Sequence, residues 1–168
     1  MLKTLVVSAI GALFGVLQST LLENLVPGGV VPDIAMIILV AAAWRYGSLR
    51  GEISGFLIGL SLDALSLAPF GFHALVYTLI GYASGRLQGT IAPSGILPPA
   101  VAVLVSTVLK YAGSFALALV FGLNSGAVRF FSVEAAWELL ANTVLAVPVF
   151  FVVLLAVEMG EGRRGGFR

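Results

Sequence analysis

The sequence predicts an all-α integral membrane protein with six transmembrane helices. This prediction rests on the composition and on the placement of the charged residues. Of the 168 residues, 60% are hydrophobic and only 10% are charged, and the mean hydropathy is +1.09. Six spans of about 20 residues each would use most of the chain and leave only short loops. These proportions exclude a soluble domain beside the spans, so we expect a single polytopic membrane domain over residues 1–168.

Charged and turn-forming residues divide the chain into six apolar segments. The predicted helices cover approximately residues 4–22, 30–46, 53–68, 70–85, 97–123 and 135–157. The first segment is longer than a signal-peptide core and has no small-residue cleavage site after Gln18, so we expect it to be retained. The third and fourth segments are short and meet at Pro69. They form either two short spans, which we prefer, or one re-entrant hairpin.

Basic residues are divided unequally between the two sides when six spans are threaded through a membrane. The side that holds both termini receives Lys3, Arg45, Arg50, Arg86, Arg163, Arg164 and Arg168, whereas the other side receives Arg129. This bias predicts a multi-pass protein with both termini in the cytoplasm. The net charge of +1 is too balanced to indicate a nucleic-acid partner.

Glycine residues recur at four-residue intervals in three of the predicted helices. The series are Gly11 and Gly15 in the first helix, Gly51, Gly55 and Gly59 in the third, and Gly81 and Gly85 in the fourth. Such spacing places glycines on one helix face and lets two helix backbones approach closely. We interpret the series as tight packing inside the molecule, with an interface between molecules as the alternative.

Asp63 continues the glycine series of the third helix and lies deep in an apolar run. An ionised carboxylate at that depth costs several kcal/mol unless it has a partner, so we expect it to face protein or water. We prefer a structural role in which Asp63 accepts hydrogen bonds near the Pro69 turn, and the alternative is a proton, ion or substrate site. His73 can reach Asp63 if the two helices pack antiparallel, although a lone histidine at this position is more simply an interfacial side chain.

Lys110 and Glu138 are the other charged residues within apolar segments. Neither can face lipid at full charge, so we expect them to pair with each other or with Asp63. A structural ion pair and a functional site are equally open for Lys110. In the last helix, Asn142 and Pro148 predict an interhelical hydrogen bond and a kink.

Signatures of catalysis and of metal binding are missing from the sequence. The chain has one histidine and no cysteine, which excludes multi-histidine and thiolate metal sites. No serine lies in a nucleophile elbow, and the glycines lie inside helices rather than in a phosphate-binding loop. We therefore expect no enzyme activity, no cofactor and no metal.

Several short motifs occur in an order that is typical of one protein family. They are Pro32-Asp33-Ile34, Arg50-Gly51, Gly55-Phe56, Gly59, Asp63, Pro69, Gly71, Ala74-Leu75 and Gly81-Tyr82. In this order, over residues 32–86, they resemble the rod shape-determining protein MreD family of bacteria. Asn142 followed by Pro148 is similar to the last helix of that family.

The resemblance implies a small bacterial inner-membrane protein without catalysis of its own, a scaffold of the cell-elongation machinery in contact with membrane lipid. It would bind an MreC-type single-span protein within a complex that holds RodA and a class B penicillin-binding protein. Through these partners it would support peptidoglycan synthesis and cell shape, with an indirect link to the actin-like MreB.

The resemblance also implies a six-helix fold similar to that of the S components of energy-coupling factor transporters. This supplies an alternative function, the substrate-binding S component of a vitamin transporter, in which Gly11 and Gly15 would lie at the docking surface. A vitamin pocket would draw polar and aromatic residues from the outer loops. Those loops are short and sparse here, which favours the scaffold.

Overall fold

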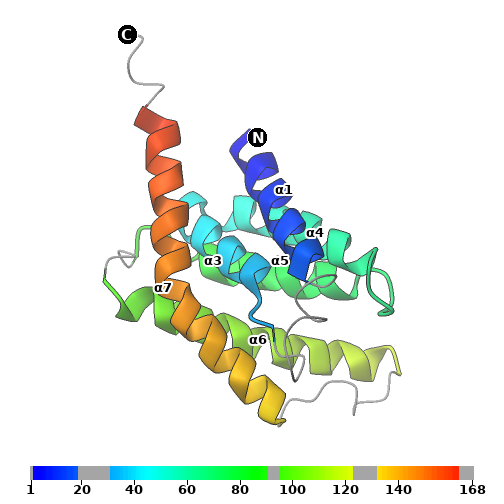
Figure 1. The fold of residues 1–168 in the computed structure, drawn as a ribbon. Coiled ribbons are helices and arrows are strands. Elements are labelled where there is room, and N and C mark those ends of the chain that lie inside the picture. Colours follow the sequence, from blue (N-terminus) through cyan, green and yellow to red (C-terminus); the bar gives the residue numbers. More distant parts are fainter. Residues whose placement is uncertain (1, 19–30, 91–94, 123–131, 163–168) are drawn as a thin grey trace.

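The computed structural model describes residues 2–18, 31–90, 95–122 and 132–162, and these residues form six helices and no strand (Figure 1). The helices are α1 (Leu2–Leu17), α3 (Ile34–Tyr46), α4 (Ser48–Asp63), α5 (Phe72–Gly85), α6 (Leu97–Val120) and α7 (Val133–Gly162). The all-helical fold class is therefore confirmed, with helices in each of the six predicted regions.

The ends of several helices differ from the predicted ones. We expected Pro32 and Asp33 to form the first turn of a helix, but α3 begins after them because Asp33 has a non-helical backbone and caps the helix. Helix α4 begins and ends about one turn earlier than predicted. It starts directly after Gly47, whose φ of 89° ends α3, and its charged first turns do not prevent helix formation. Parts of the predicted segments 4–22, 30–46 and 97–123 lie outside the described residues.

Helix α3 lies at the centre of the molecule. Every residue from Ala35 to Trp44 is buried, and the other five helices all pack on α3. Around it, neighbouring helices contact one another in the order α1, α4, α5, α6 and α7. Because residues 34–44 include no polar side chain, α3 is apolar on all sides, which is the pattern of a fully enclosed helix.

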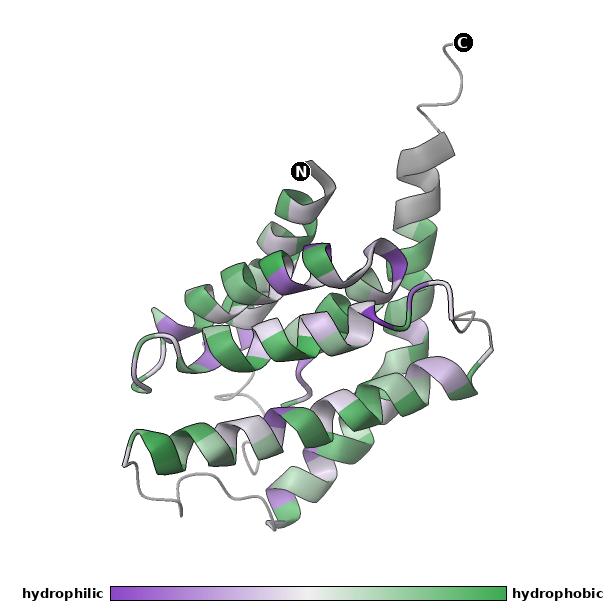
Figure 2. Ribbon diagram, turned by 180° about the vertical axis from the view of Figure 1, so that it is seen from behind, coloured by the Kyte–Doolittle hydropathy of each residue, from purple (hydrophilic) through white to green (hydrophobic). Residues whose placement is uncertain are grey.

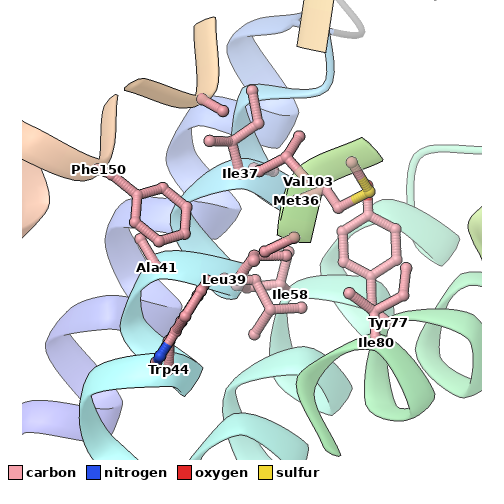
Figure 3. Close-up of a cluster of buried hydrophobic side chains, with 14 of the residues drawn as sticks. Met36, Ile37, Leu39, Ala41, Trp44, Ile58, Tyr77, Ile80, Val103 and Phe150 are labelled. Carbon is pink, nitrogen blue, oxygen red and sulfur yellow. The ribbon is translucent and has the colours of Figure 1, made fainter. Parts of the chain in front are cut away.

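The core is formed where α3 meets α4, α5, α6 and α7. Trp44 of α3 and Phe150 of α7 pack edge to face, with ring centroids 5.8 Å apart and ring planes at 87° (Figure 3). Further core residues from these helices include Leu39, Ile58 and Val103, all buried. Helix α7 contains Pro148 and changes direction part-way along its length, as a proline inside a helix predicts (Figure 1).

The outer surface of the helices is apolar. Large exposed hydrophobic side chains occur on every helix that surrounds α3, for example Leu13, Phe56, Leu79, Val105 and Val144. Figure 2 shows that hydrophobic residues cover most of α6 and α7. The buried residues, in contrast, include the polar ones Asp33, Ser54, Asp63, Ser84, Ser106, Thr107 and Asn142. The interior is mainly apolar with these polar residues among it, and so large an exposed apolar surface is unlike that of a soluble protein and fits a lipid environment.

Two of the described helices are long and apolar enough to cross a membrane by length and composition. These are residues Leu97–Val120 of α6 and Val133–Ala156 of α7. Two further helical stretches, Thr4–Leu17 and Ile34–Tyr46, are apolar but shorter. At 1.5 Å per residue, each of the two long stretches measures about 36 Å, which exceeds the ~30 Å of bilayer hydrocarbon.

The glycines of α4 and α5 bring these two helices into backbone contact. A Cβ atom built on Gly55 would collide with the carbonyl group of Tyr77, and one built on Gly59 would lie 2.5 Å from the Cα of Ala74. Gly51 and Gly81 face each other in the same way, and Gly85 faces Ser48. The four-residue spacing in these helices therefore serves packing within the molecule.

The glycine pair in α1 packs against α4. A Cβ atom on Gly11 would meet the side chain of Ile58, and one on Gly15 would lie 2.9 Å from a methyl group of Leu62. This face of α1 is therefore covered by α4 of the same molecule.

Candidate functional site: a buried polar network

The polar network of the molecule begins at Asp33, directly before α3. Its Oδ1 accepts a hydrogen bond from the backbone N–H of Met36 at 3.0 Å, which caps the helix. The backbone N–H of Asp33 donates to Oδ1 of Asn142 in α7 at 2.7 Å. One residue thus starts the central helix and fastens it to the last one.

The second carboxylate oxygen of Asp33 binds groups from two more helices. Oδ2 accepts hydrogen bonds from the hydroxyl of Tyr77 in α5 and from Nζ of Lys110 in α6, each at 2.6 Å. The same Nζ donates to Oε1 of Glu138 in α7 at 2.7 Å. The exposed fractions of the three charged side chains are 3% for Asp33, 23% for Lys110 and 15% for Glu138. The ammonium group is therefore held between two carboxylates.

Neutral side chains complete the network on α6 and α7. The hydroxyl of Tyr111 donates to Oε2 of Glu138 at 2.6 Å, and Nδ2 of Asn142 lies 3.3 Å from Oγ1 of Thr107. Within the part of the chain that the structure describes, every buried side-chain nitrogen and oxygen atom has a hydrogen-bond partner. Since an unpaired polar group in an apolar medium costs several kcal/mol, this network stabilises the contacts among α3, α5, α6 and α7.

A second polar cluster joins the end of α4 to the start of α5. The backbone N–H groups of Gly71 and Ala74 donate to Oδ2 of Asp63 at 2.9 and 3.1 Å, and that of His73 donates to Oδ1 at 2.8 Å. Nδ1 of His73 lies 2.9 Å from the same Oδ1. Asp63 thus satisfies free amides at the start of α5, and its negative charge faces the positive end of that helix.

Comparison of the sequence with family models identifies the family of the chain. The model of the rod shape-determining protein MreD family matches residues 2–159 of the chain. The chain belongs to the MreD family. The match extends well beyond the motifs of residues 32–86 and confirms the resemblance seen in the sequence.

Membership of the MreD family implies a role in rod shape determination and a place in the bacterial inner membrane. It is a family of shape-determining structural proteins. No curated protein and no solved structure matches the chain, so the expected likeness to S components has no support from a known structure.

In this MreD-family chain, the pair of Lys110 and Glu138 is present as predicted. His73 contacts Asp63, which was the alternative to the preferred interpretation of His73 as an interfacial side chain. The expectation also gave Asp63 as the alternative partner of Lys110, and this part of it was wrong. Asp63 binds residues at the start of α5, whereas the second acid at Lys110 is Asp33. Asp33 is buried because it directly precedes a helix that is enclosed on all sides.

The remaining predicted residues lie around these two clusters and along the contact of α4 and α5. Asn142 makes its interhelical hydrogen bonds within the network. Pro32 precedes Asp33, and Pro69 lies in the turn before α5, where its carbonyl accepts from the N–H of Phe72. Gly71 caps α5 with a φ of 98°, a conformation that favours glycine.

Sequence reasoning missed Tyr77, Thr107 and Tyr111 as members of the network. Tyrosine and threonine are common in membrane helices, so no single residue draws attention to itself. Their membership depends on how α5 and α6 pack around α3 and α7, which no local pattern in the sequence specifies.

The described residues contain no group of three or more His, Cys, Asp or Glu side chains placed to hold a metal ion. In the polar network, the ammonium group and the two tyrosine hydroxyls donate to carboxylates of the same chain. The arrangement can therefore hold helices in place and balance charge inside an apolar body.

Proposed function

We propose that this MreD-family chain is a non-catalytic, multi-pass scaffold of the cell-elongation machinery in the bacterial inner membrane. Its direct partner is an MreC-type single-span protein. Through a complex with RodA and a class B penicillin-binding protein, and indirectly with MreB, it supports peptidoglycan synthesis and cell shape. The observation that carries this proposal is an apolar outer surface around an interior whose buried polar side chains are all hydrogen-bonded within the described residues, in a chain that the family model matches over nearly its whole length.

We further propose that all six helices cross the membrane, with both termini in the cytoplasm. Helices α1, α4 and α5 have 16, 16 and 14 residues, and local thinning of the bilayer accommodates such short spans at modest cost. Helix α3 has only 13 residues, about 20 Å, but neighbouring helices enclose it, so it need not match the lipid thickness. The basic residues on the terminal side support this orientation.

Reporter fusions test the orientation. Alkaline phosphatase fused after Arg168 should be inactive, because it stays in the cytoplasm, whereas a green fluorescent protein at the same place should fluoresce. Strong phosphatase activity from the fusion would reverse the topology.

Binding of a single-span partner fits the kind of surface that the chain offers. Large apolar side chains are exposed on all the outer helices, so a partner is recognised through helix packing inside the membrane. The α4–α5 glycines are already used within the molecule, so the partner helix packs on the exposed apolar side chains.

Co-purification in mild detergent tests the partner. The tagged chain should retain the MreC-type protein of the same bacterium, and it should not retain a control in which the partner's transmembrane helix is replaced by a polyleucine helix of equal length. Equal retention of both, or of neither, would contradict recognition through the membrane helix.

The vitamin-transporter alternative finds no support in the structure. Its docking surface would include Gly11 and Gly15, but these glycines face Ile58 and Leu62 of α4. We therefore retain the scaffold as the proposed function.

A further inference from the structure

The turn between α4 and α5 carries large apolar side chains that the rest of the protein leaves uncovered. Leu65 is 52% exposed, Phe70 is 70% exposed, and Leu67 is exposed over its whole surface. The turn covers residues 64–71, and this stretch contains no charged residue. Exposed apolar side chains of this size, side by side in one turn, indicate contact with a protein surface or with lipid.

The lengths of the two helices place this turn within the outer leaflet of an average bilayer. Helices α4 and α5 have 16 and 14 residues, which correspond to about 24 and 21 Å. In the orientation proposed above, Arg50 in the first turn of α4 and Arg86 at the C-cap of α5 mark their cytoplasmic ends. Since the hydrocarbon of a bilayer is about 30 Å thick, both helices end before its outer surface.

The backbone of the turn is suited to an environment without water. At the end of α4, the N–H groups of Leu65 and Ser66 both donate to the carbonyl of Leu62. The free N–H groups at the start of α5 donate to the carboxylate of Asp63, a side chain that is 0% exposed. Pro69 has no N–H group to satisfy. Hydrogen bonding within the segment is what irregular backbone requires at membrane depth.

The polar side chains next to the turn are bonded within the hairpin as well. The hydroxyl of Ser61 donates to a backbone carbonyl of α4 at 2.9 Å, and that of Thr78 donates to one of α5 at 2.6 Å. A hydroxyl bonded to the preceding turn of its own helix presents no unpaired donor to lipid. The ring of His73 is 30% exposed, and its Nδ1 lies 2.9 Å from the Asp63 carboxylate.

We propose that the α4–α5 turn is embedded in the outer leaflet, where the side chains of Leu65, Leu67 and Phe70 lie among lipid acyl chains. The proposal rests on the six-span orientation stated above and deepens it. Helices α4 and α5 reach the outer leaflet, and lipid closes over the turn between them. The helix lengths and the internal hydrogen bonding favour lipid over a protein surface as the occupant. The apolar turn thereby extends the lipid contact of two helices that are short for the hydrocarbon.

Single-cysteine variants of the whole chain in lipid nanodiscs test this placement, and the natural chain contains no cysteine to remove. Leu67→Cys and, separately, Phe70→Cys place a thiol in the turn. Glu134→Cys places one at an exposed polar position in the first turn of α7, and Val105→Cys places one on the exposed apolar surface of α6. All four side chains are exposed, so the variants should fold with Tm values near that of the wild type.

Two readouts report the surroundings of each thiol. A water-soluble maleimide should react at least about tenfold more slowly with Leu67→Cys and Phe70→Cys than with Glu134→Cys, because an apolar medium keeps a thiol protonated. A bimane label on either turn variant should be quenched by lipids brominated on their acyl chains and should resist iodide in the water. The label on Val105→Cys should behave in the same way, whereas that on Glu134→Cys should respond to iodide.

Two results would overturn the proposal. Rapid maleimide reaction or iodide quenching at either turn variant would show that the turn faces water. A turn label that neither quencher reaches would show that protein covers it. Loss of acyl-chain quenching at Val105→Cys as well would contradict the placement of the chain in the membrane, on which the scaffold proposal rests, so failure of the turn proposal alone is distinguishable.

Discussion

Asp33 Oδ2 and Lys110 Nζ lie 2.6 Å apart, although 77 positions separate the two residues in the chain. The pair joins the start of the central helix α3 to the middle of α6. Through Glu138 and Asn142, α7 is bonded to the same pair. The position of the last two helices on α3 therefore depends on polar contacts as well as on the apolar core around Trp44 and Phe150.

Replacing Lys110 with methionine should destabilise the chain strongly. The substitution preserves most of the side-chain volume but leaves the buried Asp33 carboxylate without its counter-charge, which costs about 3–5 kcal/mol. The amount of folded protein in membranes and the Tm in detergent should both fall. The double variant Asp33→Asn/Lys110→Met should recover part of the loss, because asparagine still caps α3 and only Glu138 is left without its counter-charge. A double variant less stable than either single one would show that the pair is not coupled in this way.

Substitutions of Asp63 should separate its hydrogen-bonding role from a role of its charge in activity. Asp63→Leu leaves the N–H groups of Gly71, His73 and Ala74 without their acceptor, at about 1–3 kcal/mol for each buried group. Asp63→Asn keeps one acceptor oxygen but replaces the other with an NH2 group, which donates instead of accepting. Its stability should therefore lie between those of wild type and Asp63→Leu. Membrane levels and Tm should follow that order, and partner retention should decline in parallel. An Asn variant with wild-type level and Tm but no function would show that the charge itself is required.

Two glycine-to-alanine substitutions should have opposite effects. In Gly55→Ala the new methyl group meets the backbone of Tyr77, and forcing α4 and α5 apart should cost about 1–3 kcal/mol. In Gly113→Ala the methyl group makes an ordinary contact of 3.7 Å with Val76, so the higher helix propensity of alanine should stabilise α6 by up to about 1 kcal/mol. Tm values of the two purified variants provide the comparison. Equal values would contradict the backbone contact of α4 and α5.

Much of the fold could be predicted because hydropathy and glycine spacing are local signals. The apolar runs locate the helices, and the four-residue series in α4 and α5 identifies the faces that meet. The helix ends were less predictable. Helix α4 ends at Asp63 because the carboxylate accepts hydrogen bonds from N–H groups at the start of α5. These contacts join residues eight to eleven positions apart in the chain.

The polar network could be predicted only in part. Lys110 and Glu138 are conspicuous because charge is rare in apolar segments, so their pairing follows from the sequence. That Asp33 completes the group follows only from the position of α3 at the centre of the molecule. This depends on the packing of five other helices, which no local pattern in the sequence specifies.

Cell shape after depletion of the chain from the bacterium that produces it tests the central claim most directly, namely that the chain is a membrane scaffold required for rod shape. The account predicts that depleted cells widen and become round. Re-expressed wild-type chain should restore rods, and Lys110→Met should fail to do so in proportion to its lower membrane level. Rods of unchanged width after the chain has disappeared from the membrane would contradict the account.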